Sequence, residues 1–178
     1  MPAAQMIIWV LTLALTLSAA LLDSRSRRIP NWLTVPGLLV GVGVHSALTG
    51  WHGSLFALAG AGLALLILLP LVLLRGLGAG DWKLMGAVGA FLGPVLLLFV
   101  LFGSVMASGL MAFVHMMRTG RFVETLRNLG VLLKGFFSFG LRVHPQISLD
   151  NPKLMKLPFG LAVAAATLVC FCAAQWVA

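Results

Sequence analysis

Two acidic residues, Asp23 and Asp81, stand at the ends of long apolar stretches of the chain. A carboxylate in a membrane costs up to about 2.5–3.5 kcal/mol at a helix centre, so carboxylates at such places usually have a function. Two carboxylates within a few ångströms of each other hold one proton between them. The ionised member can take a proton from water, and the protonated member can support the oxyanion formed when that water attacks a peptide carbonyl. Asp23 and Asp81 are therefore candidates for a catalytic pair that needs no metal and no cofactor.

Simpler roles exist for every acidic residue in the chain. Glu124 and Asp150 lie in a strongly basic stretch, where a solvated surface or a turn is the expected role. Asp23 could pair with a neighbouring arginine, and Asp81 could cap the helix that begins after it. The glycines Gly78 and Gly80 favour the catalytic interpretation of Asp81, because they permit another backbone to approach closely. An extended substrate peptide could lie against this backbone.

Three other polar or rigid residues flank the two acids. Lys83 could bind an acidic part of a substrate or act on Asp81, although a lysine at a helix end needs no such role. Asn31 could cap the helix that it begins or bond near Asp23, and Pro30 fixes the entry of that helix. We expect Asn31 and Pro30 to be architectural. Trp82 is expected to anchor the chain at the membrane interface.

The composition shows what kind of fold must position these residues. Of the 178 residues, 61% are apolar and only 9% are charged, whereas a soluble domain carries about 25% charged residues. The chain is therefore expected to be a single membrane-embedded domain over residues 1–178, in contact with lipid and without a separate soluble domain. The two cysteines and four histidines lack the spacing of metal ligands, so no metal site is expected.

The apolar stretches predict an all-α polytopic membrane protein with about six transmembrane helices. Gly93 and Pro94 interrupt an almost uncharged run that is too long for one crossing. The predicted helices cover residues 4–22, 31–48, 54–74, 84–92, 94–117 and 157–177. Residues 118–156 carry seven basic residues between apolar positions at helical spacing, which predicts a basic amphipathic segment on the membrane surface. We expect this segment to help receive a substrate.

Basic residues set the orientation of these helices. All 12 lysines and arginines fall in three segments on one side of the predicted fold, which is the cytoplasmic side by the positive-inside rule. Both termini are then outside, and Asp23 and Asp81 lie at the same cytoplasmic depth, where they can meet. The net charge of +8 belongs to these loops, so nucleic-acid binding is not expected.

The motif Gly78-Ala79-Gly80-Asp81 resembles that of the type IV prepilin peptidases, a family of membrane aspartic proteases. Further residues match the family in chain order. They are Asp23 followed by Arg28-Ile29-Pro30-Asn31-Trp32-Leu33-Thr34, then Asp81-Trp82-Lys83-Leu84, and finally Pro158-Phe159-Gly160. The resemblance extends from about residue 20 to residue 165.

The resemblance implies that Asp23 and Asp81 are the catalytic pair of a six-helix protein of the bacterial inner membrane. It also implies the substrates: prepilins or pseudopilins whose short basic leader is cut at the cytoplasmic face. Larger members, which also methylate the new N-terminus, have an insert with paired C-x-x-C motifs where this chain has only residues 24–30. Methyltransferase activity is therefore not expected, and the chain is similar to the short peptidases of tight-adherence, or Flp, pili.

Three other interpretations remain open at this point. A proton- or ion-coupled transporter could use the two acids as a relay, but a relay needs acids near the membrane midplane. A noncatalytic membrane subunit of a pilus or secretion assembly could use the basic segment to bind partners or anionic lipid, which leaves the paired acids unexplained. A protease that cuts within transmembrane helices could share the glycine motif.

Overall fold

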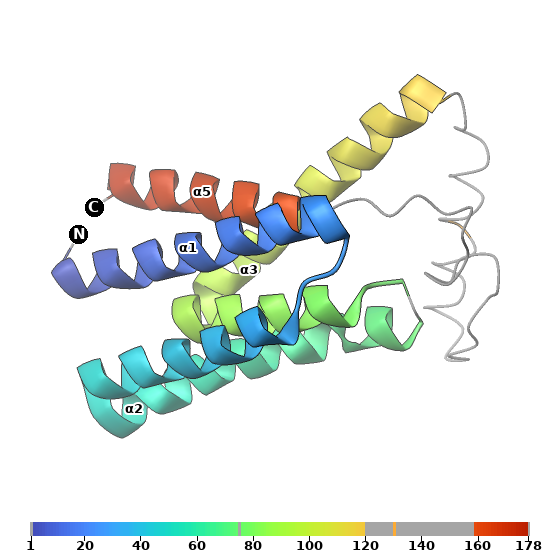
Figure 1. The fold of residues 1–178 in the computed structure, drawn as a ribbon. Coiled ribbons are helices and arrows are strands. Elements are labelled where there is room, and N and C mark those ends of the chain that lie inside the picture. Colours follow the sequence, from blue (N-terminus) through green and yellow to red (C-terminus); the bar gives the residue numbers. More distant parts are fainter. Residues whose placement is uncertain (1, 75, 120–129, 131–158, 178) are drawn as a thin grey trace.

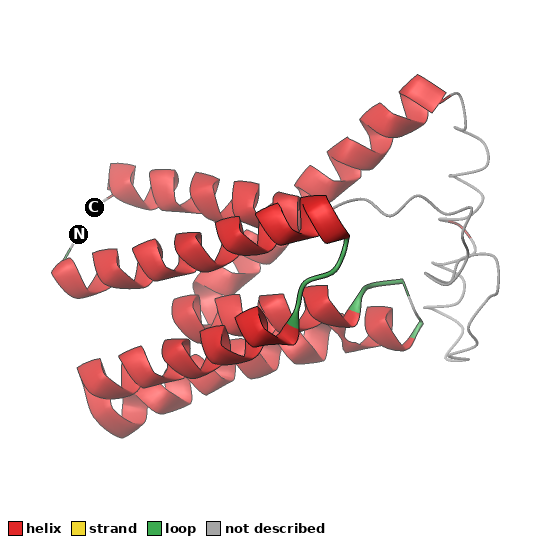
Figure 2. Cartoon of the chain, in the orientation of Figure 1, coloured by secondary structure: helices red, strands yellow, loops and turns green. Residues whose placement is uncertain are grey.

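The computed structural model describes residues 2–74, 76–119, 130 and 159–177, which are mostly helical, with short loops at residues 27–30 and 76–78 (Figure 2). The expected surface segment at 118–156 lies outside the described residues except for 118, 119 and 130, and so does Pro158. The helices are α1 (Ala3–Ser26), α2 (Asn31–Leu73), α3 (Ala79–Thr119) and α5 (Phe159–Val177). The described residues contain no strand.

Each of these helices contains a stretch long and apolar enough to cross a membrane, so the chain is an all-α membrane protein. The expected number of six spans is not reproduced, because the described residues give four helices and four candidate spans. The segments expected at 31–48 and 54–74 run together in α2, and those at 84–92 and 94–117 run together in α3. The breaks expected between them are so short, at Thr49 and Gly50 in α2 and at Gly93 in α3, that helical structure resumes at once.

Within α2 the chain turns back on itself (Figure 1). Ser46 Oγ and Ser54 Oγ lie 2.7 Å apart, whereas eight residues of straight helix would span about 12 Å. Gly50 makes this turn with φ 61° and ψ −138°, a conformation that glycine adopts without the clash that a Cβ would cause.

The break in α3 is held by side chains of α2. Gly93 has φ 72°, and Pro94 after it has no N–H to continue the helical hydrogen bonds. The Nε2–H of His45 donates to the carbonyl oxygen of Phe91 at 2.7 Å. The ring of Phe56 lies against Gly93, where any Cβ would overlap it, and stacks at a tilt on His45. The break is therefore a fixed part of the fold.

Small residues set the packing of the helices. The backbones of Gly60 in α2 and Gly89 in α3 touch, so that a Cβ on either glycine would overlap the backbone of the other. Such glycines let helices approach closely in membranes, where apolar area alone gives little drive for association. On the other side of the molecule α1 packs against α5, with Trp9 against Phe171 at 5.7 Å between ring centroids, and the two termini lie side by side (Figure 1).

The contact between Gly60 and Gly89 leads to a prediction about stability. Gly60→Ala should lower the stability of the purified protein in detergent by about 1–3 kcal/mol, because its Cβ would force the two helices apart. Gly62→Ala is the matched control, since a Cβ at Gly62 would meet no atom within 4 Å. Thermal unfolding of both variants measures the effect, and an equal Tm for Gly60→Ala and the wild-type protein would contradict it.

Candidate active site

Asp23 ends a buried stripe of α1. The buried residues of this helix recur every three or four positions and are Trp9, Thr12, Leu15, Thr16, Ala19, Ala20 and Asp23, so they share one face. Asp23 is only 6% exposed. Arg27, the C-cap residue that follows α1, has a left-handed backbone (φ 51°) and donates its N–H to the carbonyl oxygen of Asp23 at 2.8 Å. The stripe therefore carries a carboxylate at the end of the bundle where α1 stops.

The carboxylate of Asp23 is held by the first turn of α5. The backbone N–H of Gly160 donates to Asp23 Oδ2 at 2.9 Å, and the positive end of the helix dipole favours an anion there. A Cβ on Gly160 would lie 3.1 Å from Asp23 Oδ2 and 3.3 Å from the carbonyl oxygen of Ala19. Glycine thus allows the backbone of α5 to reach the acid. Phe159 beside it packs on the hydrophobic core.

Asp81 lies in the first turn of α3 and is half-buried. The backbone of Gly78 forms a hydrogen bond to its carboxylate, and a Cβ on Gly78 would lie 2.8 Å from Asp81 Oδ2. A Cβ on Gly80 would lie 2.8 Å from the carbonyl oxygen of Ile29. Both glycines, expected to admit a substrate backbone, are thus closely approached by the protein itself.

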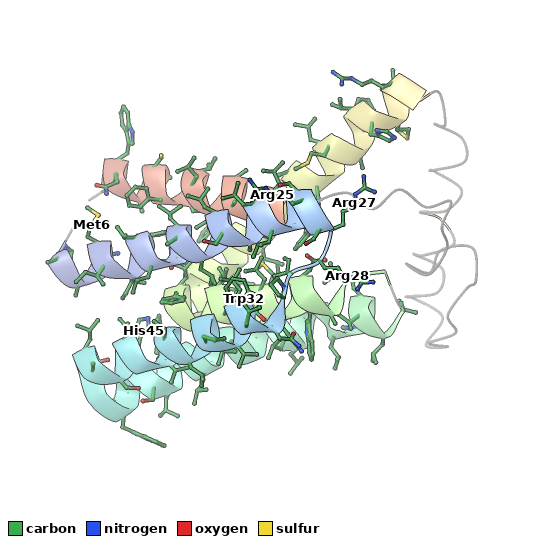
Figure 3. All side chains as sticks on the ribbon, viewed as in Figure 1. Met6, Arg25, Arg27, Arg28, Trp32 and His45 are labelled. Carbon is green, nitrogen blue, oxygen red and sulfur yellow. The ribbon has the colours of Figure 1, made fainter. Side chains whose placement is uncertain are left out.

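The two aspartates lie near each other on separate helices. Asp23 and Asp81 are close enough for the charge of one to act on the other. They lie at the end of the bundle where residues 27–30 link α1 to α2, and Figure 3 shows Arg25, Arg27 and Arg28 at this same end. The arrangement therefore brings two acidic side chains from separate helices to one end of the bundle.

Three other residues singled out from the sequence lie at the start of α2 and in the first turns of α3. Lys83 Nζ donates to Asn31 Oδ1 at 3.0 Å, so these two bind each other. Pro30 precedes α2 with an extended backbone (φ −76°, ψ 149°). Within the described part of the chain no three His, Cys, Asp or Glu side chains gather as a metal site would require.

One residue beside the pair has a contact that sequence reasoning missed. The indole N–H of Trp82, expected only as an interfacial anchor, donates to the carbonyl oxygen of Leu65 at 2.8 Å. The sequence shows that Trp82 is next to Asp81, but it does not show that Leu65, which lies in another helix, accepts its hydrogen bond.

The sequence model of the type IV leader peptidase family matches residues 9–113. The chain belongs to this family. Neither the curated proteins nor the solved structures gave a significant match. The matched range contains both aspartates and both glycines before Asp81, whereas Gly160, which holds Asp23, lies beyond it.

The contact between Gly160 and Asp23 predicts that residue 160 is sensitive to substitution. Gly160→Ala should displace Asp23 by a few tenths of an ångström and lower processing of a leader-bearing substrate about tenfold, because small misplacements of reacting groups are costly. Gly109→Ala serves as the control, since a Cβ there would meet no atom within 4 Å. Processing is measured by gel shift at matched protein levels, and full activity of Gly160→Ala would refute the prediction.

Proposed function

We propose that this protein is an aspartic endopeptidase that removes the short basic leader from prepilins or pseudopilins. The proposal rests on the placement of Asp23 and Asp81, which belong to separate helices and lie at one end of the bundle, near enough for the charge of one to act on the other. Membership of the type IV leader peptidase family supports the substrate class.

In the proposed reaction the ionised member of the pair takes a proton from a water molecule between the two carboxyl groups. The water oxygen attacks the scissile carbonyl carbon, and the protonated member donates a hydrogen bond to the developing oxyanion. When the C–N bond breaks, a proton passes to the leaving nitrogen, giving a free amine and a carboxylic acid. No metal or cofactor takes part.

The proposed topology has six crossings, because α2 and α3 are each interrupted near their middle. Both termini are then outside a bacterial inner membrane, and the aspartates face the cytoplasm together with Arg25, Arg27 and Arg28. The leader of a substrate would reach the site from that side. Residues 118–156 are proposed to receive it at the membrane surface.

The short loop between α1 and α2 supports a peptidase without methyltransferase activity. α1 ends at Ser26 and α2 begins at Asn31, so no cysteine-rich insert separates them. The transporter alternative is less well supported, because both acids of the described residues lie at one end of the bundle and a relay needs acids along its path.

Substitution of either aspartate tests the proposal. Asp23→Asn and Asp81→Asn should each lower processing of a co-expressed prepilin by about 10³-fold or more, as expected for members of a catalytic unit. Ser24→Ala is the neighbouring control, since Ser24 is exposed and, within the described part of the chain, its hydroxyl bonds only to the carbonyl oxygen of Leu21, in its own helix. Gel shift of the precursor measures cleavage, with membrane levels of each variant matched.

The outcomes of this experiment test the catalytic pair and the substrate class separately. Loss of cleavage in both aspartate variants, with Ser24→Ala active, supports the catalytic pair. If both variants still cut, the pair is not catalytic. If the wild-type protein cuts no tested prepilin, the substrate class is wrong.

A further inference from the structure

Asp81 lies on the part of α3 that is least stable by itself. The first N–H groups of a helix have no acceptor within it, and this helix starts just after Gly78 with Gly80 in its first turn. Each glycine in a helix lowers its stability by about 1 kcal/mol relative to alanine. Contacts with other elements must therefore fix the direction in which the Asp81 side chain points.

On one side, Trp82 ties this turn to the second half of α2. Its indole N–H donates to the carbonyl oxygen of Leu65 at 2.8 Å in a partly buried place, and its ring packs on the hydrophobic core. One turn later, a Cβ on Gly86 would lie 3.0 Å from the side chain of Leu65. The Trp82 face of α3 thus rests directly on Leu65.

On another side, the same turn is tied to the start of α2. Lys83 bonds to Asn31, and Gly80 lies against the carbonyl oxygen of Ile29. Successive residues of a helix are about 100° apart around its axis, so Gly80 and Lys83 point in similar directions and Trp82 points in another.

Asp81 points in a third direction around the helix axis, away from both the Trp82 contact and the Lys83 contact. It shares a helix face with Leu84, Met85 and Val88, one and two turns on, and all three are fully buried. Rotation of the turn about the helix axis would break the bond of Trp82 or that of Lys83, and either rotation would move the Asp81 carboxylate relative to Asp23.

Trp82 differs from the tryptophans that fit an interfacial belt. Trp32, Trp51 and Trp176 are 67%, 72% and 92% exposed, as side chains facing lipid headgroups are. Trp82 is partly buried, and its N–H is bonded to a backbone carbonyl inside the protein.

We propose that Trp82 is a positioning residue for Asp81: the bond from its indole N–H to the carbonyl oxygen of Leu65 fixes the rotation of the first turn of α3. The inference rests on the proposed function in so far as it treats Asp81 as catalytic. It assigns Trp82 no contact with the substrate, so its loss acts on the rate of the chemical step more than on substrate binding.

The test compares Trp82→Phe, which keeps an aromatic ring and removes the N–H, with Trp32→Phe as the matched control. Prepilin cleavage by the purified variants in detergent should show kcat lowered about tenfold for Trp82→Phe, with KM within about twofold of wild type, because a misdirected catalytic group slows the reaction without loss of binding. Trp32→Phe should leave both constants unchanged. Lys83→Met, which removes the hydrogen bond from Lys83 to Asn31, should also lower kcat.

Amide hydrogen exchange over residues 79–86 gives a readout that does not depend on activity. Faster exchange in Trp82→Phe at 79–86, with unchanged exchange in α5, together with the lower kcat supports the proposal. Unchanged exchange in Trp82→Phe overturns it, whatever happens to kcat, and so does an unchanged kcat. If the wild-type protein cuts no prepilin, the proposed function fails, and the exchange experiment still decides whether Trp82 fixes this turn.

Discussion

The hydrogen bond from the Gly160 N–H to the Asp23 carboxylate joins residues 137 positions apart in the chain, and the arrangement of the site depends on it. A carboxylate placed among apolar helices needs a donor, because a buried charge without one is strongly unfavourable. The first turn of α5 has free N–H groups to offer. The bond therefore provides the acid with a donor and the helix end with an acceptor, and it joins α5 to α1 at Asp23.

Glycine is the residue that makes these approaches possible at both aspartates. Gly160 brings the backbone of α5 to Asp23, and Gly78 leaves room for the carboxylate of Asp81. Away from the site, Gly60 and Gly89 bring α2 and α3 into backbone contact. Since close helix packing in membranes relies on small residues, the same residue type shapes the site and holds the elements around it.

The sequence predicted the all-α membrane fold and placed Asp23 and Asp81 at one end, because hydropathy and the distribution of arginines record how helices lie in a membrane. It also indicated the interruptions near Gly50 and Gly93, but the described residues form four continuous elements because helical structure resumes at once after each break. The bonds of Gly160 to Asp23 and of Trp82 to Leu65 could not be predicted. Each joins a residue to a distant backbone atom, and helical periodicity does not specify which backbone atoms of another helix come within reach.

The bend of α3 at Gly93 also has a consequence for the order of folding during synthesis. Its shape is held by His45 and Phe56, and both belong to α2, which leaves the ribosome first. Because N-terminal parts of a chain fold ahead of later ones during synthesis, α2 can be formed before the segment around Gly93 is made. The side chains that hold the bend are therefore made before the residues that they hold.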